Sequence, residues 1–180
     1  MVKSWFVAIF ILLFSPFSGF AQTNLSNNYV ISLADDDLNG RWHLVMSNSR
    51  FWKKAKRSDI IIDFTISADK TIEELIEYKQ KGKMHSIRLS SIRTSPSHFV
   101  SKPVSGMHFF KNYWYAVAMD AGKQWLVIYH VNGLFRRESV DVISRSASFS
   151  ERENEQFQKL CGENYFLKAK TSHMSMWISH

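Results

Sequence analysis

Short apolar runs with a two-residue period follow one another along the chain from about residue 40 onward. The clearest lies at 59–68, where Ile60, Ile62 and Phe64 fall on one side and Asp63 on the other. This alternation is typical of a half-buried strand. Comparable runs lie at 42–46, 84–94, 98–102, 106–110, 112–120, 123–131 and 137–145. Their short spacing indicates antiparallel strands joined by tight connections.

The segment 71–83 fits two structures. Ile72 and Ile76 lie at helical spacing, and the local propensity of the segment favours a helix. As a strand, the same two residues share a face with Tyr78, and Glu74 lies among them. We predict a strand, because hairpins surround the segment and tertiary context often overrides propensity.

The hydrophobic period changes after the last of these strands. Ser150 followed by Glu153 forms a capping box, in which each side chain satisfies a free backbone donor of the first helical turn. A helix is therefore predicted at about 150–161, and Gly162 is expected to end it. The segment 164–170 is a candidate outer strand. The apolar side of the predicted helix carries Phe157, Leu160 and Cys161.

About eight antiparallel strands followed by one helix predict an all-β fold, an eight-stranded up-and-down barrel with the helix packed outside. Closure into a barrel removes the exposed edges of a sheet. A two-sheet sandwich is the alternative. The interior of an eight-stranded barrel can hold side chains or one small ligand. We expect one domain over 38–180, since the chain shows neither an internal repeat nor a second domain.

The first residues have the layout of an export signal. Lys3 precedes a nearly continuous apolar run at 5–14, and small residues precede a cleavage point after Ala21. We therefore expect 1–21 to be removed and the protein to be periplasmic or secreted; an uncleaved anchor is the alternative. No cysteine follows the cut, so no lipid attachment is expected there. The polar segment 22–37 is expected to lie loosely over the surface.

Charge and cysteine content narrow the classes of partner. The formal net charge is +7, and loss of Lys3 with the signal leaves +6. Such a basic balance favours anionic surfaces in general. We do not expect nucleic-acid binding, because zinc-ligand spacing, a phosphate-binding loop and a basic recognition helix are all missing from the sequence. Cys161 is the single cysteine, so an internal disulfide is impossible.

Three segments carry a family resemblance. Gly-Arg-Trp at 40–42 opens the first strand, and the hairpin at 112–131 is similar to the sixth and seventh strands of lipocalins. The segment 142–160 resembles the end of the eighth lipocalin strand, its arginine and the helix that follows. Over most of 38–161 the chain resembles lipocalins, and it is closest to the bacterial and apolipoprotein D-like group.

The resemblance implies structural roles for Gly40, Trp42 and Arg145. In lipocalins the indole fills the closed end of the barrel and the guanidinium stacks on its face. Such a cation–π contact contributes about 0.5–2 kcal/mol. A glycine beside it lets the entering chain approach closely. The chain departs from the family in the longer spacing between Asp120 and Trp125 and in lacking disulfides.

The resemblance also implies that the barrel binds and carries a small hydrophobic or amphipathic ligand of the fatty acid or lysolipid class. Aromatic residues form 14% of the chain, which suits an apolar cavity. The faces of the last four candidates rest on alternation alone, and a slip of one residue would invert them. The candidate wall residues are Ile62, Phe64, Ile76, Tyr78, Tyr113, Tyr115, Val127 and Tyr129.

A basic and aromatic segment at 50–57 falls in the first long loop, which by resemblance lies at the mouth of the barrel. Its composition suits an anionic headgroup or an anionic membrane surface. The alternative is a solvated loop whose aromatic side chains fold back on the barrel. The residues of this mouth loop are Phe51, Trp52, Lys53, Lys54, Lys56 and Arg57.

Little in the sequence points to catalysis, a metal or a cofactor, and none of these is expected. The seven histidines are scattered singly. Cys161 is expected to be an inert buried thiol. Glu73, Glu74 and Glu77 are expected mostly to face solvent. Two alternatives remain: an enzyme for a lipid-like substrate, which needs a polar pair inside the cavity, and a haem or metal carrier, which needs an inward histidine.

Overall fold

The computed structural model describes residues 31–54, 56–105, 111–132, 137–171 and 174–176. The expected signal segment and the strand-like run at 106–110 lie outside these residues. The strands are β1 (Gly40–Ser47), β2 (Arg57–Ile66), β3 (Ile72–Gln80), β4 (Lys83–Ser95), β5 (His98–Pro103), β6 (Asn112–Met119), β7 (Trp125–Asn132), β8 (Arg137–Ser144) and β9 (Ser175–Met176). The helices are α1 (Asp35–Leu38), α2 (Arg50–Lys54), α3 (Glu151–Glu163) and α4 (Tyr165–Thr171).

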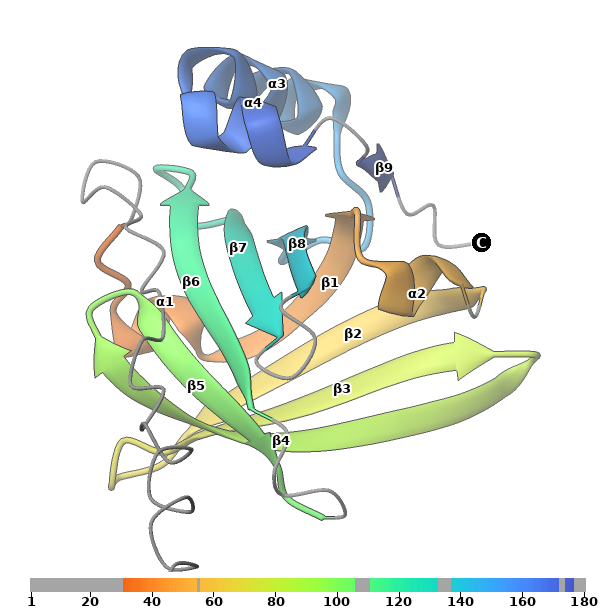
Figure 1. The fold of residues 1–180 in the computed structure, drawn as a ribbon, viewed down its shortest axis with the longest axis vertical. Helices are drawn as coiled ribbons and strands as arrows, with labels where there is room; N and C mark the ends of the chain where they lie inside the picture. The colour runs from red at the N-terminus through yellow and green to blue at the C-terminus, as the bar shows by residue number, and fades with distance from the viewer. Residues whose placement is uncertain (1–30, 55, 106–110, 133–136, 172–173, 177–180) are drawn as a thin grey trace, which may run out of the picture.

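The first eight strands form a closed antiparallel barrel, as predicted. Each strand from β1 to β8 pairs with the next, and β8 pairs with β1 to complete the circle. The two-residue β9 pairs with β1 beside this junction. The helices α1 and α2 lie at opposite ends of the barrel, while α3 and α4 lie together on one side (Figure 1).

The segment with two possible structures is a strand. β3 pairs along its full length with β4 and along most of it with β2. These ladders satisfy backbone groups on both sides of β3, which outweighs a helical propensity of a few tenths of a kcal/mol per residue. Ile72, Ile76 and Tyr78 are buried on one face, as predicted for a strand. Glu74 is buried with them, and this corrects the expectation that it faces solvent.

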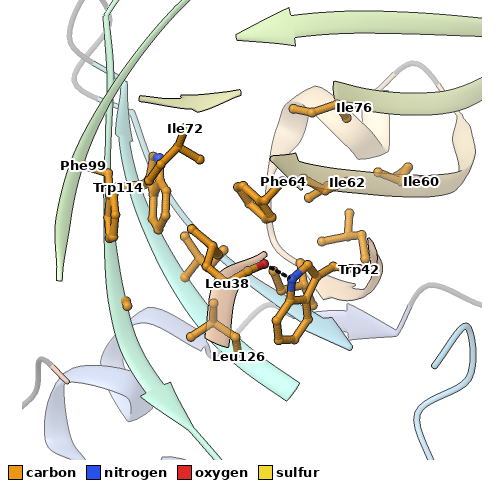
Figure 2. Close-up of a cluster of buried hydrophobic side chains, with 14 of the residues drawn as sticks. Leu38, Trp42, Ile60, Ile62, Phe64, Ile72, Ile76, Phe99, Trp114 and Leu126 are labelled. Atoms are coloured by element: carbon orange, nitrogen blue, oxygen red, sulfur yellow. Dashed lines mark hydrogen bonds between the residues drawn. The ribbon is translucent and has the colours of Figure 1, made fainter. Parts of the chain in front are cut away.

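Trp42 fills the end of the barrel where β1 begins. Its side chain is fully buried, and its indole N–H donates a hydrogen bond of 2.7 Å to the carbonyl oxygen of Leu38 (Figure 2). The guanidinium carbon of Arg145 lies 3.7 Å from the centroid of the Trp42 ring. The contact expected between the first and last strands is therefore present.

Arg145 also ties the entering chain to this closed end. Its guanidinium donates hydrogen bonds of 2.8 Å to the carbonyl oxygen of Asp37 and of 3.2 Å to that of Arg41. Gly40 lies directly beneath it with a φ of +98°, and a Cβ at this position would lie 3.2 Å from Nη1 of Arg145. Both the backbone conformation and the close approach therefore require glycine here.

The described end of the segment before β1 is fixed to the barrel, so the expectation of a loose polar covering is wrong there. Leu33 is only 2% exposed. Backbone hydrogen bonds join Ile31 to Ala116 and Leu33 to Pro96. Apolar side chains at alternate positions can thus anchor a segment whose overall composition is polar.

The helix after β8 begins with the predicted capping box. The backbone N–H of Glu153 donates to Ser150 Oγ at 3.3 Å, and that of Ser150 donates to Glu153 Oε2 at 2.7 Å. α3 ends at Glu163, one residue beyond the glycine expected to stop it. Within the described part of the chain, no helix is both long and apolar enough to span a membrane.

The candidate outer strand at 164–170 is instead the helix α4. Asn164 accepts the backbone N–H of Leu167 at 3.0 Å and so caps a second helical start. Leu167 is fully buried in the layer between the helices and the barrel. A local cap and one buried anchor therefore decide this segment, and the chain here does not extend the sheet.

α3 and α4 cover the outer side of the barrel over β6, β7, β8 and β1 (Figure 1). Phe157, Cys161 and Leu167 pack there against outward-facing side chains of the strands. Burial raises the pKa of the Cys161 thiol, which makes the reactive thiolate scarce. These strands consequently bury both of their faces, one inside the barrel and one beneath the helices.

Candidate ligand-binding cavity

A cavity of about 1340 Å³ occupies the barrel and opens at the end opposite Trp42. This volume exceeds the 300–1,000 Å³ of ordinary small-molecule sites. Its apolar wall is built from seven strands, so the closed register of the barrel positions it. The apolar wall residues on the strands are Ile62, Phe64, Ile76, Ile87, Leu89, Pro103, Trp114, Ile128 and Ile143.

Three predicted wall residues, Ile62, Phe64 and Ile76, line the cavity. Figure 2 shows them on β2 and β3 within the buried cluster. Tyr78 lies on the same face but belongs to the packing near the mouth. Its ring stacks on His85, with a centroid distance of 5.5 Å.

The other four predicted wall residues, Tyr113, Tyr115, Val127 and Tyr129, do not line the cavity. Val127 and Tyr129 are buried in the layer beneath α3 and α4, and Tyr115 packs against that layer. Tyr113 lies near His98, with a centroid distance of 6.0 Å. The sequence prediction assigned these strands to the wrong face by one residue, because both faces are apolar and alternation is hidden.

The true inward residues of these strands are Trp114 on β6, Ile128 and His130 on β7, and Asp141 and Ile143 on β8. Sequence reasoning missed all five. The usable signal was the apolar face of the predicted helix, since that face requires an equally apolar outer strand surface beneath it.

The first part of the mouth loop forms the short helix α2 beside the open end, and Arg57 begins β2. Trp52 is buried, and its indole N–H lies 3.4 Å from Asp141 Oδ2. Its ring also packs edge-on against Phe51 and Tyr78. Phe51 remains 45% exposed. One aromatic residue of the loop therefore folds back on the barrel and the other faces outward.

Basic side chains dominate the rim, which we define as the charged residues that line the cavity at its mouth. Two acidic residues of the described lining lie near the mouth: Glu138 is ion-paired with Lys170, and Asp141 is buried against His130. Arg57 stacks over Phe51, with its guanidinium carbon 3.8 Å from the ring centroid. Lys56 is exposed outside the cavity lining, and the side chain of Lys54 is not described. The basic rim residues are Arg50, Lys53, Arg57, Lys111 and Arg137.

A polar network crosses the upper wall around Asp141, which is buried. Ser47 Oγ donates to Asp141 Oδ1 at 2.5 Å, and Nε2 of His130 lies 3.3 Å from Asp141 Oδ2. The other ring nitrogen of His130 lies 3.1 Å from Nδ2 of Asn112. With Nε2 carrying the proton, His130 donates to Asp141 and accepts from Asn112.

This network bears on the enzyme and metal alternatives. His130 and Asp141 are a polar pair inside the cavity, and His130 is an inward histidine. Protein partners engage both ring nitrogens, however, so neither points freely at a ligand atom. Among the described residues, no group of three or more histidine, cysteine or acidic side chains is arranged to hold a metal ion. The geometry favours a role in shaping polar contacts to a ligand.

A second buried acid, Glu74, lines the deeper part of the cavity and is 6% exposed. Three donors meet at Oε1 of Glu74. Ser101 Oγ donates to it at 2.9 Å, the indole N–H of Trp114 donates to it at 3.2 Å, and Ser91 Oγ also donates to it. Burial raises the pKa of Glu74, and the hydrogen bonds from Ser91, Ser101 and Trp114 lower it by less. Burial therefore favours the neutral form of this acid more than solvent would.

The raised pKa of Glu74 predicts a pH dependence of stability. The folded protein binds this proton more tightly than the unfolded chain does, so the contribution of Glu74 falls as pH rises above the ordinary value of 4.5. Glu74→Gln lacks the titration. Its stability relative to wild type should rise with pH, with a limiting slope of about 1.4 kcal/mol per pH unit.

Urea unfolding of wild type and Glu74→Gln across a pH series measures this difference. Glu73→Gln is the matched control, because Glu73 is the exposed neighbour on the opposite face of β3. A plot of its free energy of unfolding against pH should run nearly parallel to that of wild type. A Glu74→Gln curve that is also parallel would show that the carboxyl keeps an ordinary pKa in the fold.

No protein-family model matches this chain, and no curated protein matches it. Solved structures do. The siderocalin Ex-FABP, described as functioning through dual ligand specificities, has a TM-score of 0.60 at 16% identity, over 80% of this chain and 95% of that one. The odorant-binding protein OBP1 has a TM-score of 0.58 at 9% identity, over 82% and 95% of the two chains.

A deswapped triple mutant of bovine odorant-binding protein gives a TM-score of 0.54 at 14% identity, over 80% of this chain and 95% of that one. These three proteins are lipocalins. At such low identity the likeness concerns the fold, which agrees in the eight-stranded closed barrel with a helix packed alongside. The chain therefore has the lipocalin fold.

Proposed function

We propose that this protein is an exported lipocalin that binds and carries an amphipathic anion of the fatty acid or lysolipid class. The main support for this proposal is a cavity of about 1340 Å³ with an apolar wall beneath a rim that holds five basic residues. An acyl chain suits the wall and an anionic headgroup suits the rim. The export signal expected at 1–21 supports a role outside the cytoplasm.

Apolar burial supplies the driving force in this proposal. Each buried methylene contributes about 0.8 kcal/mol, so ten contribute about 8 kcal/mol before costs. Association and ordering offset several kcal/mol of this gain. The rim then selects among chains of equal length, because an opposite charge gains Coulomb energy and a like charge loses it.

The structural neighbours support binding in general. One is a siderocalin with dual ligand specificities and two are odorant-binding proteins, so this fold accommodates small ligands in those proteins. Phe51 adds an exposed apolar side chain beside the basic rim. That combination suits an anionic membrane surface as the source of the ligand.

A headgroup series on one chain length tests the proposal. Hexadecanoate, hexadecanol and hexadecylamine share a chain of sixteen carbons and differ in the charge of the headgroup. The expected order of affinity is anion, then alcohol, then amine, with a gap of about tenfold or more between the anion and the amine. Displacement of a fluorescent fatty acid measures all three. Absence of displacement, or equal affinity for the anion and the amine, would contradict the proposal.

A further inference from the structure

Glu74 lies at the deep end of the cavity. It pairs in register with Phe64, and Phe64 pairs with Gly40, where β1 enters the closed end. At the other end of β3, Gln80 pairs with Arg57 of the rim. Six residues of strand separate Glu74 from Gln80, which corresponds to about 20 Å. The acid is thus placed to meet the far end of a chain whose headgroup stays at the rim.

Among the described residues, the hydrogen bonds to Glu74 engage one carboxyl oxygen and leave the other for a ligand. Ser91, Ser101 and Trp114 all direct their donors at Oε1, and none of these donors reaches Oε2. Ser101 also accepts from the indole N–H of Trp114 at 2.9 Å. Glu74, Ser101 and Trp114 all line the cavity. The protein therefore fixes the carboxyl group through Oε1 and leaves Oε2 facing the cavity.

Burial of the Glu74 carboxyl limits the kind of ligand group that can contact it. A protonated carboxyl both donates and accepts, which matches a hydroxyl group. A second carboxylate at this depth would have to enter apolar surroundings without a cation beside it. An amine could pair with ionised Glu74, but it would have to pass the five basic residues of the rim.

We propose that Glu74 recognises a hydroxyl group at the far end of the ligand's apolar chain, so that the preferred ligand is a hydroxylated long-chain anion. This inference rests on the proposed function and adds a second polar contact to it. Without such a partner, the buried acid would face an acyl chain and lose hydrogen bonding.

Three ligands of equal chain length test the assignment: hexadecanoate, ω-hydroxyhexadecanoate and ω-aminohexadecanoate. Wild type should bind the hydroxy acid on the order of tenfold more tightly than hexadecanoate, as one added buried hydrogen bond allows. Glu74→Leu should abolish or reverse this preference. Glu74→Gln should keep most of it, because its amide can still accept from the three donors and offer N–H to the ligand. Glu73→Leu, on the exposed face, is the control and should keep it fully.

The outcomes separate this inference from the proposed function. Failure of wild type to bind hexadecanoate would contradict the proposed function itself. Binding of hexadecanoate as tightly as the hydroxy acid would overturn only the role of Glu74. A preference of wild type for ω-aminohexadecanoate would also overturn this role, since an ion pair would then replace the contact between a neutral carboxyl and a hydroxyl group. Should Glu74→Leu fail to fold, the order of the three ligands on wild type still decides.

Discussion

Replacing Trp42 by alanine is expected to lower the free energy of unfolding by about 3–5 kcal/mol, as for other buried aromatic truncations. The indole is fully buried and carries the hydrogen bond to Leu38. Its loss would leave the guanidinium of Arg145 above a void at the closed end. Domains of this kind are stable by only about 5–15 kcal/mol, so the change would remove a large share.

Urea unfolding of wild type and Trp42→Ala measures this effect. Arg145→Ala should cost less, because the cavity it leaves is partly exposed and Trp42 keeps its other contacts. Arg41→Ala, on the exposed face of the same strand, is the control and should change stability little. An unfolding midpoint unchanged by Trp42→Ala would show that the closed end does not depend on this side chain.

Changing three rim cations together, Arg50, Lys111 and Arg137, to serine should weaken hexadecanoate binding by at least about tenfold. Each cation near an anionic headgroup contributes on the order of 1 kcal/mol at a largely solvated site. Hexadecanol binding should change little, because the apolar wall is untouched. High salt should reduce the difference between wild type and the variant, since exposed charges are screened.

The chain offers a matched control for this variant. Arg152, Lys159 and Lys168 are exposed on α3 and α4, outside the barrel. Changing these three to serine alters the net charge equally without touching the rim. Hexadecanoate affinity should then remain close to that of wild type. Equal losses in both variants would mean that overall charge, and not the rim, attracts the ligand.

Local patterns were sufficient for most elements of the fold. The two-residue period located β2, and the succession of hairpins identified β3 against its own propensity. The capping box located the start of α3. The pairing of Trp42 with Arg145 came from a family resemblance and joins the first strand to the last. Each of these features depends on neighbouring residues or on a recognisable motif.

The site was less accessible from sequence, because its residues depend on register between distant strands. Glu74 contacts Ser91, Ser101 and Trp114 on three other strands, and no local sequence pattern predicts these contacts. The inward face of β6 to β8 was misassigned because α3 and α4 bury the outer face as well. Alternation identifies an interior only where the other face is polar.

Native mass spectrometry of a cavity-filling variant tests the central claim, that the barrel interior binds the amphipathic anion. Leu89 lines the cavity and is only partly buried, so Leu89→Trp should narrow the interior with little overpacking. Arg88→Trp adds the same side chain at the exposed neighbouring position. We predict a one-to-one hexadecanoate complex for wild type and Arg88→Trp, and a markedly smaller bound fraction in Leu89→Trp. A complex that persists unchanged in Leu89→Trp would place the ligand outside the barrel and contradict this account.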